Sequence, residues 1–287
     1  MLATLNDMLP AMATQPRAIA HCNVWGYEDA RAVVEAAEAM NCPVILGLNR
    51  LAVEHMGVEV LAGILRPIGK NARVPVCIHL DHGKDLETAV AAMEAGFTSV
   101  MYDGSQWPLE ENIARTREVV AEARKRGLSV EGEVGSVPYS DMPGAAKNMK
   151  SDPQEVARFA AETGVVAVAI SIGNVHRLET EKVDLEFDRL EAIQRETSTP
   201  LVLHGASGVR ETDWSRLRAS RIAKVNFGTT LRQAFMRELR HQIADQPTQL
   251  DRVRLFRPCM EKVRDEAWRI FLLLGHQAPV AATEGRG

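Results

Sequence analysis

His79-Leu80-Asp81-His82-Gly83 follows directly on an apolar run, residues 74–78, that is typical of a buried strand. A carboxylate and an imidazole therefore leave the same strand end together. Two later apolar runs end close to His176 and His204 in the same way. The sequence thus places an imidazole at the end of each of three predicted strands.

Three imidazoles with a fourth position left open are the ligand set of a catalytic zinc site. For any one histidine in an apolar setting, the role of a satisfied core residue is the commoner one. Their shared placement changes this expectation, because the strand ends of an α/β barrel converge on one face, where active sites lie. We therefore expect His82, His176 and His204 to bind a single metal ion.

Composition and charge favour small-molecule chemistry. Lys and Arg number 34 against 38 Asp and Glu, and the net charge of -4 provides no basic surface for nucleic acid or an anionic membrane. Four cysteines without a C-x-x-C pair indicate free thiols in a reducing compartment; they are Cys22, Cys42, Cys77 and Cys259. No signal peptide and no long apolar span is evident. These features predict a cytoplasmic protein.

Apolar strands and amphipathic helices alternate along the chain. Strands are expected at 18–24, 43–48, 74–78, 99–104, 128–134, 165–171, 200–204 and 222–227. Helices are expected at 28–40, 53–68, 86–95, 109–125, from 153 onward, and at 187–196, 211–218 and 229–243. Eight strand-helix units are enough to close one barrel. The prediction is an α/β fold, a single (β/α)8 TIM barrel that comprises residues 1–287.

Three segments exceed what a minimal barrel needs. Residues 249–274 predict an extra C-terminal helix that covers the barrel or a partner subunit, and residues 275–287 a flexible tail. The Gly-, Pro- and Ser-bearing stretch 135–150 is longer than usual strand-helix connections. We expect this stretch to be a lid or a binding loop.

Four segments, in this order and spacing, resemble the class II zinc-dependent fructose-bisphosphate and tagatose-bisphosphate aldolases, over about residues 23–235. They are His79-Leu80-Asp81-His82-Gly83, Glu131-Gly132-Glu133-Val134-Gly135, His204-Gly205-Ala206-Ser207-Gly208 and Lys224-Val225-Asn226. The resemblance implies a lyase that cleaves a phosphorylated ketose into dihydroxyacetone phosphate, or a similar ketone, and an aldehyde. It also implies one zinc ion per subunit, a monovalent cation (Na+ or K+) in several members, and a homodimer or homotetramer.

The resemblance also implies roles for residues near the metal. His82, His176 and His204 would be the zinc ligands, with Glu133 as an alternative ligand. Asp81 would hydrogen-bond and protonate the aldehyde oxygen; orienting a ligand histidine is its alternative role. The chemistry has a physical basis, because breaking a carbon-carbon bond beside a carbonyl leaves an enediolate whose charge a Lewis-acidic metal stabilises.

Two loops after the seventh and eighth predicted strands lie where many barrels hold a phosphate. The resemblance implies that these loops bind the donor phosphate through Gly205, Ser207, Asn226, Gly228 and Thr229. Gly228 stands where members of the family have a polar residue. Asn49 stands where the family has Ser or Thr at the second strand end, so the substrate-holding shell is altered.

Two further departures concern catalysis. The family loop carries a Gly-Gly-x-Glu-Asp segment whose glutamate moves the proton on the donor carbon, whereas this chain has Ser136-Val137-Pro138-Tyr139-Ser140-Asp141. By count Asp141 replaces the glutamate; Tyr139, or a lost base, is the alternative. Arg177 replaces a glycine, and its planar fork could grip a phosphate or carboxylate, the plain alternative being a solvated arginine. We expect an aldolase whose substrate differs from fructose bisphosphate.

Two other functions remain open at this point. A metal-dependent sugar isomerase or epimerase on the same barrel would need a second proton-transfer group, for which Asp103 or Glu131 could serve. A non-catalytic, aldolase-like partner subunit would retain the barrel and lack the base. The altered stretch 136–141 is the reason to consider this second alternative.

Overall fold

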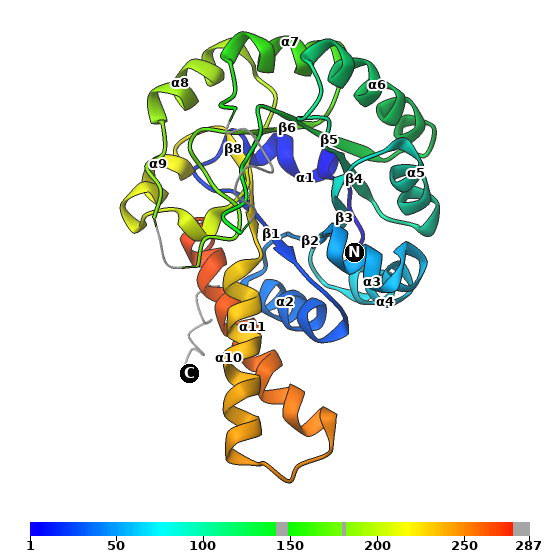
Figure 1. The fold of residues 1–287 in the computed structure, drawn as a ribbon, viewed down its shortest axis with the longest axis vertical. Coiled ribbons are helices and arrows are strands. Elements are labelled where there is room, and N and C mark those ends of the chain that lie inside the picture. Colours follow the sequence, from blue (N-terminus) through cyan, green and yellow to red (C-terminus); the bar gives the residue numbers. More distant parts are fainter. Residues whose placement is uncertain (142–148, 180–181, 278–287) are drawn as a thin grey trace, which may run out of the picture.

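The computed structural model describes residues 1–141, 149–179 and 182–277. Eight parallel strands close into a barrel in chain order, and the last strand pairs with the first through Ile19 and Lys224. Helices surround the strands as an outer ring (Figure 1). The predicted α/β barrel is therefore confirmed.

The strands are β1 (Ile19–Asn23), β2 (Val44–Leu48), β3 (Val76–Gly83), β4 (Ser99–Tyr102), β5 (Ser129–Val134), β6 (Ala167–Ile170), β7 (Leu201–Leu203) and β8 (Ile222–Phe227). The α-helices are α1 (Leu5–Met12), α2 (Tyr27–Met40), α3 (Arg50–Met56), α4 (Val58–Asn71), α5 (Leu86–Ala95), α6 (Leu109–Lys125), α7 (Pro153–Thr163), α8 (Phe187–Glu196), α9 (Trp214–Arg218), α10 (Thr229–Asp245) and α11 (Arg252–Leu273). Two short 3-10 turns, Ala206–Gly208 and Glu211–Asp213, follow β7.

Two predicted boundaries were wrong. β3 continues to Gly83, so the motif of residues 79–83 forms the last part of the strand and does not follow it. The predicted helix 53–68 is divided into α3 and α4 at Gly57, whose φ of +78° lies in the left-handed region that favours glycine.

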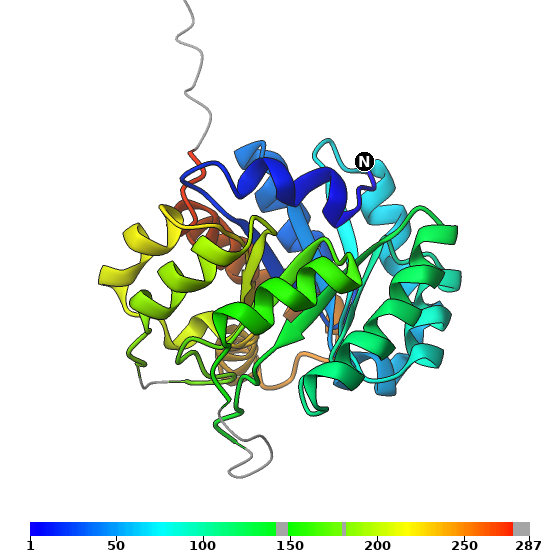
Figure 2. The same cartoon turned by 90° about the horizontal axis from the view of Figure 1, so that it is seen from above.

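α1 was not predicted, and it covers the end of the barrel from which the strands start (Figure 2). A capping box begins the helix: the Thr4 side chain accepts from the Asp7 N–H (3.3 Å), and the Asp7 carboxylate accepts from the Thr4 N–H (2.8 Å). The Leu5 N–H donates to Ser129 Oγ on β5 (2.9 Å). α1 therefore closes the barrel opposite to the strand ends.

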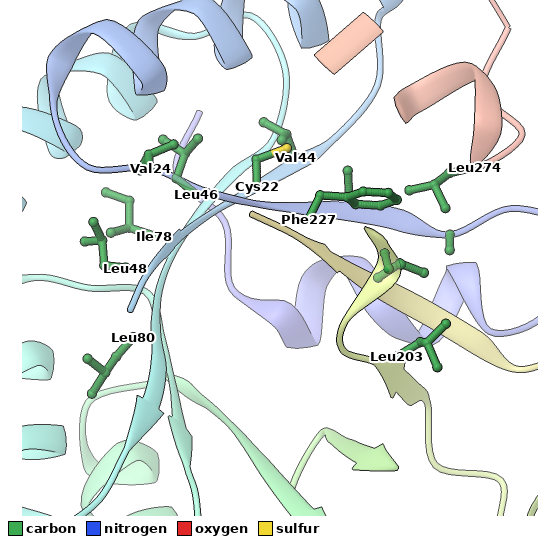
Figure 3. Packing of buried hydrophobic residues seen from close by; sticks show 14 of the residues in the cluster. Cys22, Val24, Val44, Leu46, Leu48, Ile78, Leu80, Leu203, Phe227 and Leu274 are labelled. Atoms are coloured by element: carbon green, nitrogen blue, oxygen red, sulfur yellow. The ribbon is translucent and has the colours of Figure 1, made fainter. Parts of the chain in front are cut away.

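Two apolar layers surround the strands. Inside the barrel, side chains at the starts of the strands pack with Leu5, Met8 and Leu9 of α1; they are Ile19, Ile45, Cys77, Met101, Ala167, Ala169, Val202 and Ala223. Outside, alternate strand residues such as Leu46 and Ile78 belong to the larger cluster between strands and helices (Figure 3). The rest of the barrel interior, toward the strand ends, is left to polar side chains.

α10 and α11 pack against each other, and α11 also packs on α2. This helical pair extends well past the barrel (Figure 1). Most of the predicted tail, residues 278–287, and the centre of the predicted lid, residues 142–148, lie outside the described residues. Within the described part of the chain, no helix is both long and apolar enough to span a membrane.

Candidate active site

Three histidines meet above the barrel interior. His82 lies near the end of β3, His204 directly follows β7, and His176 lies in the connection after β6. Their ring centroids are 4.8 to 5.5 Å apart, and one nitrogen of each ring lies within 4.8 Å of the others. The structure thus brings the three predicted metal ligands together.

Carboxylates hold two of these rings by the outer ring nitrogen, which is the nitrogen that points away from the other histidines. His82 Nδ1 donates to Asp103 Oδ2 (2.8 Å), and His204 Nε2 donates to Glu131 Oε1 (3.0 Å). In a neutral ring, an outer N–H leaves the inner nitrogen with a free lone pair. His82 Nε2 and His204 Nδ1 face each other at 3.0 Å. The ring orientations are those of metal-binding histidines.

The third ring supports the same conclusion. His176 Nε2 is buried and has no hydrogen-bond partner within the part of the chain that the structure describes. Burial lowers the pKa of His176 well below its usual range, so the ring is neutral and can bind a metal. An orphaned buried nitrogen is costly unless a ligand satisfies it. The donor set fits a catalytic zinc ion, which is held by three protein ligands and keeps its fourth position for water or substrate.

The backbone of His82 is in the left-handed region, with a φ of +56°. Such a conformation costs a non-glycine residue free energy of order 1–3 kcal/mol and is typical of functional sites. Burial alone would lower the pKa of His82, but the carboxylates of Asp81 and Asp103 raise it well above its usual value in the metal-free protein. A proton and a metal ion therefore compete for this ring.

A charged layer lies beneath the histidines. Lys224 Nζ donates to Glu131 Oε2 (2.8 Å), and both side chains are completely buried. Burial would raise the pKa of Glu131, but Lys224 and His204 hold it well below its usual value. The ring of His21 also belongs to this layer. It lies directly against Gly47, because a Cβ added to Gly47 would lie 1.6 Å from His21 Nε2. This layer holds His204 in place from below.

Asp81 lies beside the three rings, with its Oδ1 3.9 Å from His82 Nε2. Asn23 Nδ2 and Asn226 Nδ2 donate to its two oxygens at 2.9 and 3.3 Å. Burial would raise the pKa of Asp81, but His21 and His82 hold it well below its usual range. Asp81 is therefore ionised at neutral pH and able to accept a proton from a bound hydroxyl group.

A single pocket joins these groups. Its lining comprises Asn23, Trp25, Asn49, Asp81, His82, Tyr139, His176, Arg177, Gly205, Ala206, Ser207, Asn226, Gly228, Thr229 and Arg232. All the residues predicted to hold substrate or phosphate are in this set. Gly205, with a φ of +71°, allows the loop after β7 to lie directly against Val175. An ionised carboxylate, two of the three histidines and two polar loops thus face one space, while His204 is completely buried and is not part of the lining.

The comparisons agree with this geometry. The family model described as "Fructose-bisphosphate aldolase class-II" matches residues 3–278. The chain belongs to the class II fructose-bisphosphate aldolase family. It is therefore a metal-dependent aldolase, a carbon-carbon lyase, as the resemblance predicted.

Individual relatives are similar over most of their length. The chain is 36% identical to a 6-phospho-5-dehydro-2-deoxy-D-gluconate aldolase of Shouchella clausii, over 84% of each chain. It is 32% identical to a probable fructose-bisphosphate aldolase of Bacillus subtilis, over 92% of this chain and 94% of the relative. The crystal structure of the YdjI aldolase from Escherichia coli K12 superposes with a TM-score of 0.84 at 32% identity, covering 96% of this chain and 98% of that one.

Besides the buried His204, two predicted residues of this aldolase are not part of the pocket lining. Glu133 Oε2 is 3.7 Å from His82 Nδ1, on the outer side of the ring, and its Oε1 accepts from the Val137 N–H (3.2 Å). Asp141 accepts from Arg177 Nη1 (2.8 Å) and is half exposed. Neither side chain is part of the pocket lining.

Three pocket residues were missed from the sequence. Asn23 and Trp25 come from the end of β1, where the rule applied to the other strand ends would have found them. Arg232 lies three residues after Thr229, one turn into α10. Helical spacing places residues three apart on the same face, so Thr229 is a signal for Arg232.

The geometry of this aldolase does not favour the isomerase alternative. Asp103 accepts from His82 and from the hydroxyl of Ser105 (2.7 Å), and Glu131 is paired with Lys224 and His204. Neither carboxylate lines the pocket. Among the described residues that line it, Asp81 is the one carboxylate, so a second proton-transfer carboxylate across the pocket is missing from that set.

Proposed function

We propose that this aldolase cleaves a phosphorylated ketose by a retro-aldol reaction, which yields dihydroxyacetone phosphate, or a similar ketone, and an aldehyde. The observation that supports this proposal is the cluster of three histidine rings, two of which line the same pocket as the ionised Asp81. A small polar pocket at the strand ends of a barrel is the usual place for such chemistry.

His82, His176 and His204 would hold one zinc ion per subunit. When bound, zinc supplies Lewis-acid stabilisation for the negative charge that develops on the substrate oxygen beside the breaking bond. The support is the inward-facing nitrogen set and the orphaned His176 Nε2. Glu133 would serve as an alternative ligand from the outer side of His82. A monovalent cation, Na+ or K+, is proposed as a second cofactor on the family resemblance alone.

Asp81 moves the proton on the aldehyde half. In cleavage, its carboxylate accepts the proton of the hydroxyl whose carbon becomes the aldehyde, and in condensation it returns this proton. Asn23 and Asn226 hold its two oxygens, so the carboxylate has a fixed direction in the pocket. His82 directly follows Asp81 in the sequence, so the proton transfer takes place beside the metal ligands.

Asp141 is our candidate for the group that moves the proton on the donor carbon. By count, Asp141 stands where the family has its loop glutamate. Its neighbour Tyr139 lines the pocket, and the Tyr139 ring stacks on His176 with the ring centroids 4.5 Å apart. Burial raises the pKa of Tyr139, so its hydroxyl stays protonated at neutral pH and can donate but not accept this proton. Asp141→Asn tests the assignment: it should slow cleavage and leave zinc content unchanged.

The substrate class follows from the altered pocket. Relatives named for fructose bisphosphate and for 6-phospho-5-dehydro-2-deoxy-D-gluconate are about equally similar to this chain. Asn49, Arg177, Gly228 and Arg232 all line the pocket and supply its distinctive chemistry. We propose a phosphorylated ketose other than fructose bisphosphate, with phosphorylated keto-sugar acids as the first candidates.

Product analysis tests the function directly. Zinc-loaded protein is mixed with a panel of ketose monophosphates, ketose bisphosphates and phosphorylated keto-sugar acids, and the products are identified by mass spectrometry. We expect two carbonyl fragments from at least one substrate, and neither zinc nor cleavage with His204→Ala. An isomer of equal mass, or no turnover of any substrate, would refute the aldolase proposal.

Two further properties belong to the proposal, the subunit number and the location in the cell. The family resemblance suggests a homodimer or homotetramer, and the α10–α11 pair exposes apolar side chains, among them Leu250, at 95% exposure, and Val253. The four free, buried cysteines support a cytoplasmic location, because thiols stay reduced there. Light scattering of the purified protein measures the subunit number.

A further inference from the structure

Two neighbouring side chains hold the ring of Tyr139 at the pocket. The ring stacks on His176, with the ring centroids 4.5 Å apart and the two planes within 16° of parallel. The guanidinium carbon of Arg177 lies over the same ring, 4.9 Å from its centroid, which is within the range of a cation–π contact. These two contacts fix the direction of the ring and therefore the position of its hydroxyl.

Main-chain hydrogen bonds hold the same segment. The chain on both sides of Tyr139 forms a short parallel bridge with His176. The His176 N–H donates to the Pro138 carbonyl (2.8 Å), and the His176 carbonyl accepts from the Ser140 N–H (3.1 Å). The Ser140 hydroxyl also donates to the Arg177 carbonyl (2.9 Å). The backbone of Tyr139 is thus fixed to the segment that carries a predicted metal ligand.

The hydroxyl of Tyr139 is available to a ligand. Tyr139 is partly buried and is part of the pocket lining. Among the described residues, its oxygen has no hydrogen-bond partner and is not one of the completely buried polar atoms. A tyrosine hydroxyl can donate one hydrogen bond. A fixed donor of this kind, open to the pocket, suits an oxygen atom of the substrate.

Tyr139 and Asp81 approach the pocket from opposite sectors of the barrel. Tyr139 follows β5, and its ring stacks on His176, which follows β6. The carboxylate of Asp81 is bound by Asn23 at the end of β1 and by Asn226 of β8. In a closed barrel of eight strands in chain order, β5 lies opposite β1. Because Asp81 acts on the aldehyde half in the proposed function, the hydroxyl of Tyr139 is placed for the ketone half.

The ketone half is where negative charge develops. When the carbon-carbon bond breaks, its electron pair stays on the ketone half and forms an enediolate with a negatively charged oxygen. A rigid donor that points at such an oxygen stabilises the transition state more than the ground state. The loss of one donor of this kind typically costs about 10²- to 10³-fold in kcat.

We propose that Tyr139 is a catalytic residue whose hydroxyl donates a hydrogen bond to the enediolate oxygen on the ketone half and keeps its own proton. The inference rests on the proposed function, in which this half carries the developing charge. The role concerns an oxygen atom, whereas the proton on the donor carbon remains assigned to Asp141. Asp81 and Tyr139 thus serve the two halves of the substrate separately.

The test uses Tyr139→Phe, which removes the hydroxyl and retains the ring that stacks on His176. Tyr27→Phe is the matched control, because Tyr27 is 52% exposed and is not part of the pocket lining. Steady-state kinetics on zinc-loaded protein give kcat and KM for the substrate found by product analysis. Calorimetry gives the affinity for phosphoglycolohydroxamate, whose two adjacent oxygens imitate those of the enediolate. NMR in D2O gives the exchange rate of the carbon-bound protons of dihydroxyacetone phosphate, which reports enediolate formation without an aldehyde.

Tyr139→Phe should lower kcat and the exchange rate by about 10²-fold or more, with KM within about threefold and zinc content unchanged. Affinity for the hydroxamate should fall by about tenfold or more, the scale of a hydrogen bond to a charged group. Tyr27→Phe should leave all of these quantities unchanged. Asp81→Asn should slow cleavage far more than exchange, because Asp81 serves the aldehyde half.

Two results would overturn the inference. One is an unchanged kcat in Tyr139→Phe together with a loss in Tyr139→Ala, which would show that the ring and not the hydroxyl is needed. The other is a lower kcat in Tyr139→Phe with unchanged exchange and hydroxamate affinity, which would place the hydroxyl at the aldehyde half. Failure of the proposed function looks different, because the wild type would then neither cleave any substrate of the panel nor exchange the protons of dihydroxyacetone phosphate.

Discussion

His82 shows how neighbouring atoms prepare a side chain for metal binding. Asp103 fixes its outer nitrogen, and its inner nitrogen faces His204 at 3.0 Å. The raised pKa of His82 means that the metal-free ring carries a proton at neutral pH. A metal ion must displace this proton before it binds.

The pH dependence of zinc affinity follows from this competition. Below the raised pKa of His82 a proton occupies the ring, so affinity should fall as the pH falls, by about tenfold per pH unit for one proton. Above that pKa the affinity should level off. Competition with a chromogenic chelator between pH 5.5 and 9 measures the curve. An affinity that is constant across this range would contradict the assigned protonation.

Asp81 is the residue for which binding and chemistry should separate most clearly. Asp81→Asn keeps the size of the side chain and removes its ability to accept a proton. We expect zinc content to stay at one per subunit while kcat falls by about 10²-fold or more, the usual contribution of a general acid or base. Metal analysis and steady-state kinetics are the two measurements. An unchanged kcat would leave Asp81 with an orienting role.

The close approach of the loop between β7 and α9 to Val175 depends on Gly205. In Gly205→Ala, the new Cβ would approach the Val175 carbonyl to 2.4 Å, next to His176. Backbone must shift to relieve this contact, so we expect weaker zinc binding and a lower kcat. Gly127→Ala is the matched control, because Gly127 has a similar φ of +67° and nothing within 4 Å of the added atom.

Comparison of the two glycine variants therefore separates the effect of the positive φ from the effect of the steric contact with Val175. Both should lose about 1 kcal/mol or more of unfolding free energy, because alanine is disfavoured at positive φ. Zinc affinity should fall in Gly205→Ala alone. Equal zinc affinity in the two variants would show that the β7 loop tolerates displacement without disturbing the ligands.

α1 contributes stability without chemistry. Leu9 is completely buried in the apolar layer at the start of the strands, at the opposite end of the barrel from the histidines. Leu9→Ala should lower the unfolding free energy by about 2–5 kcal/mol, the range for buried leucines. Val60→Ala, at a position 54% exposed on α4, should change it by no more than about 0.5 kcal/mol. Denaturant unfolding measures both, and zinc affinity should stay constant in each.

At this scale, elements were easier to predict than their ends. Period-two and apolar runs located all eight strands, because parallel strands of a barrel are buried on both faces. The division of α3 and α4 at Gly57 was missed, since an isolated glycine is tolerated within a helical pattern. α1 was missed although Thr4 and Asp7 form a capping box, because eight residues carry little periodicity.

The whole molecule separates stability from chemistry along the barrel axis. The apolar layer lies at the α1 end, the Glu131–Lys224 layer in the middle, and the pocket at the strand ends. The sequence predicted the histidine trio because barrel topology brings strand ends together. It could not predict that Glu131 turns to Lys224 and His204, because such contacts depend on side-chain directions in the closed barrel.

Metal removal tests this separation. After chelation the barrel should keep its far-UV circular dichroism, because the apolar layers do not involve the histidines. Activity should be lost and should return when zinc is added. Thermal unfolding should occur at a lower temperature without zinc, since a ligand that binds the folded state stabilises it. Loss of secondary structure on chelation would show that the metal holds the fold.

The clamping of His82 by Asp103 and of His204 by Glu131 has a kinetic consequence. Rings fixed before the ion arrives need no search through rotamers, so capture of zinc should proceed in one phase whose rate grows in proportion to ion concentration. Rapid mixing of stripped enzyme with zinc would show this as a single exponential. Starved of the ion and then resupplied, such an enzyme would regain activity as fast as the ion reaches it.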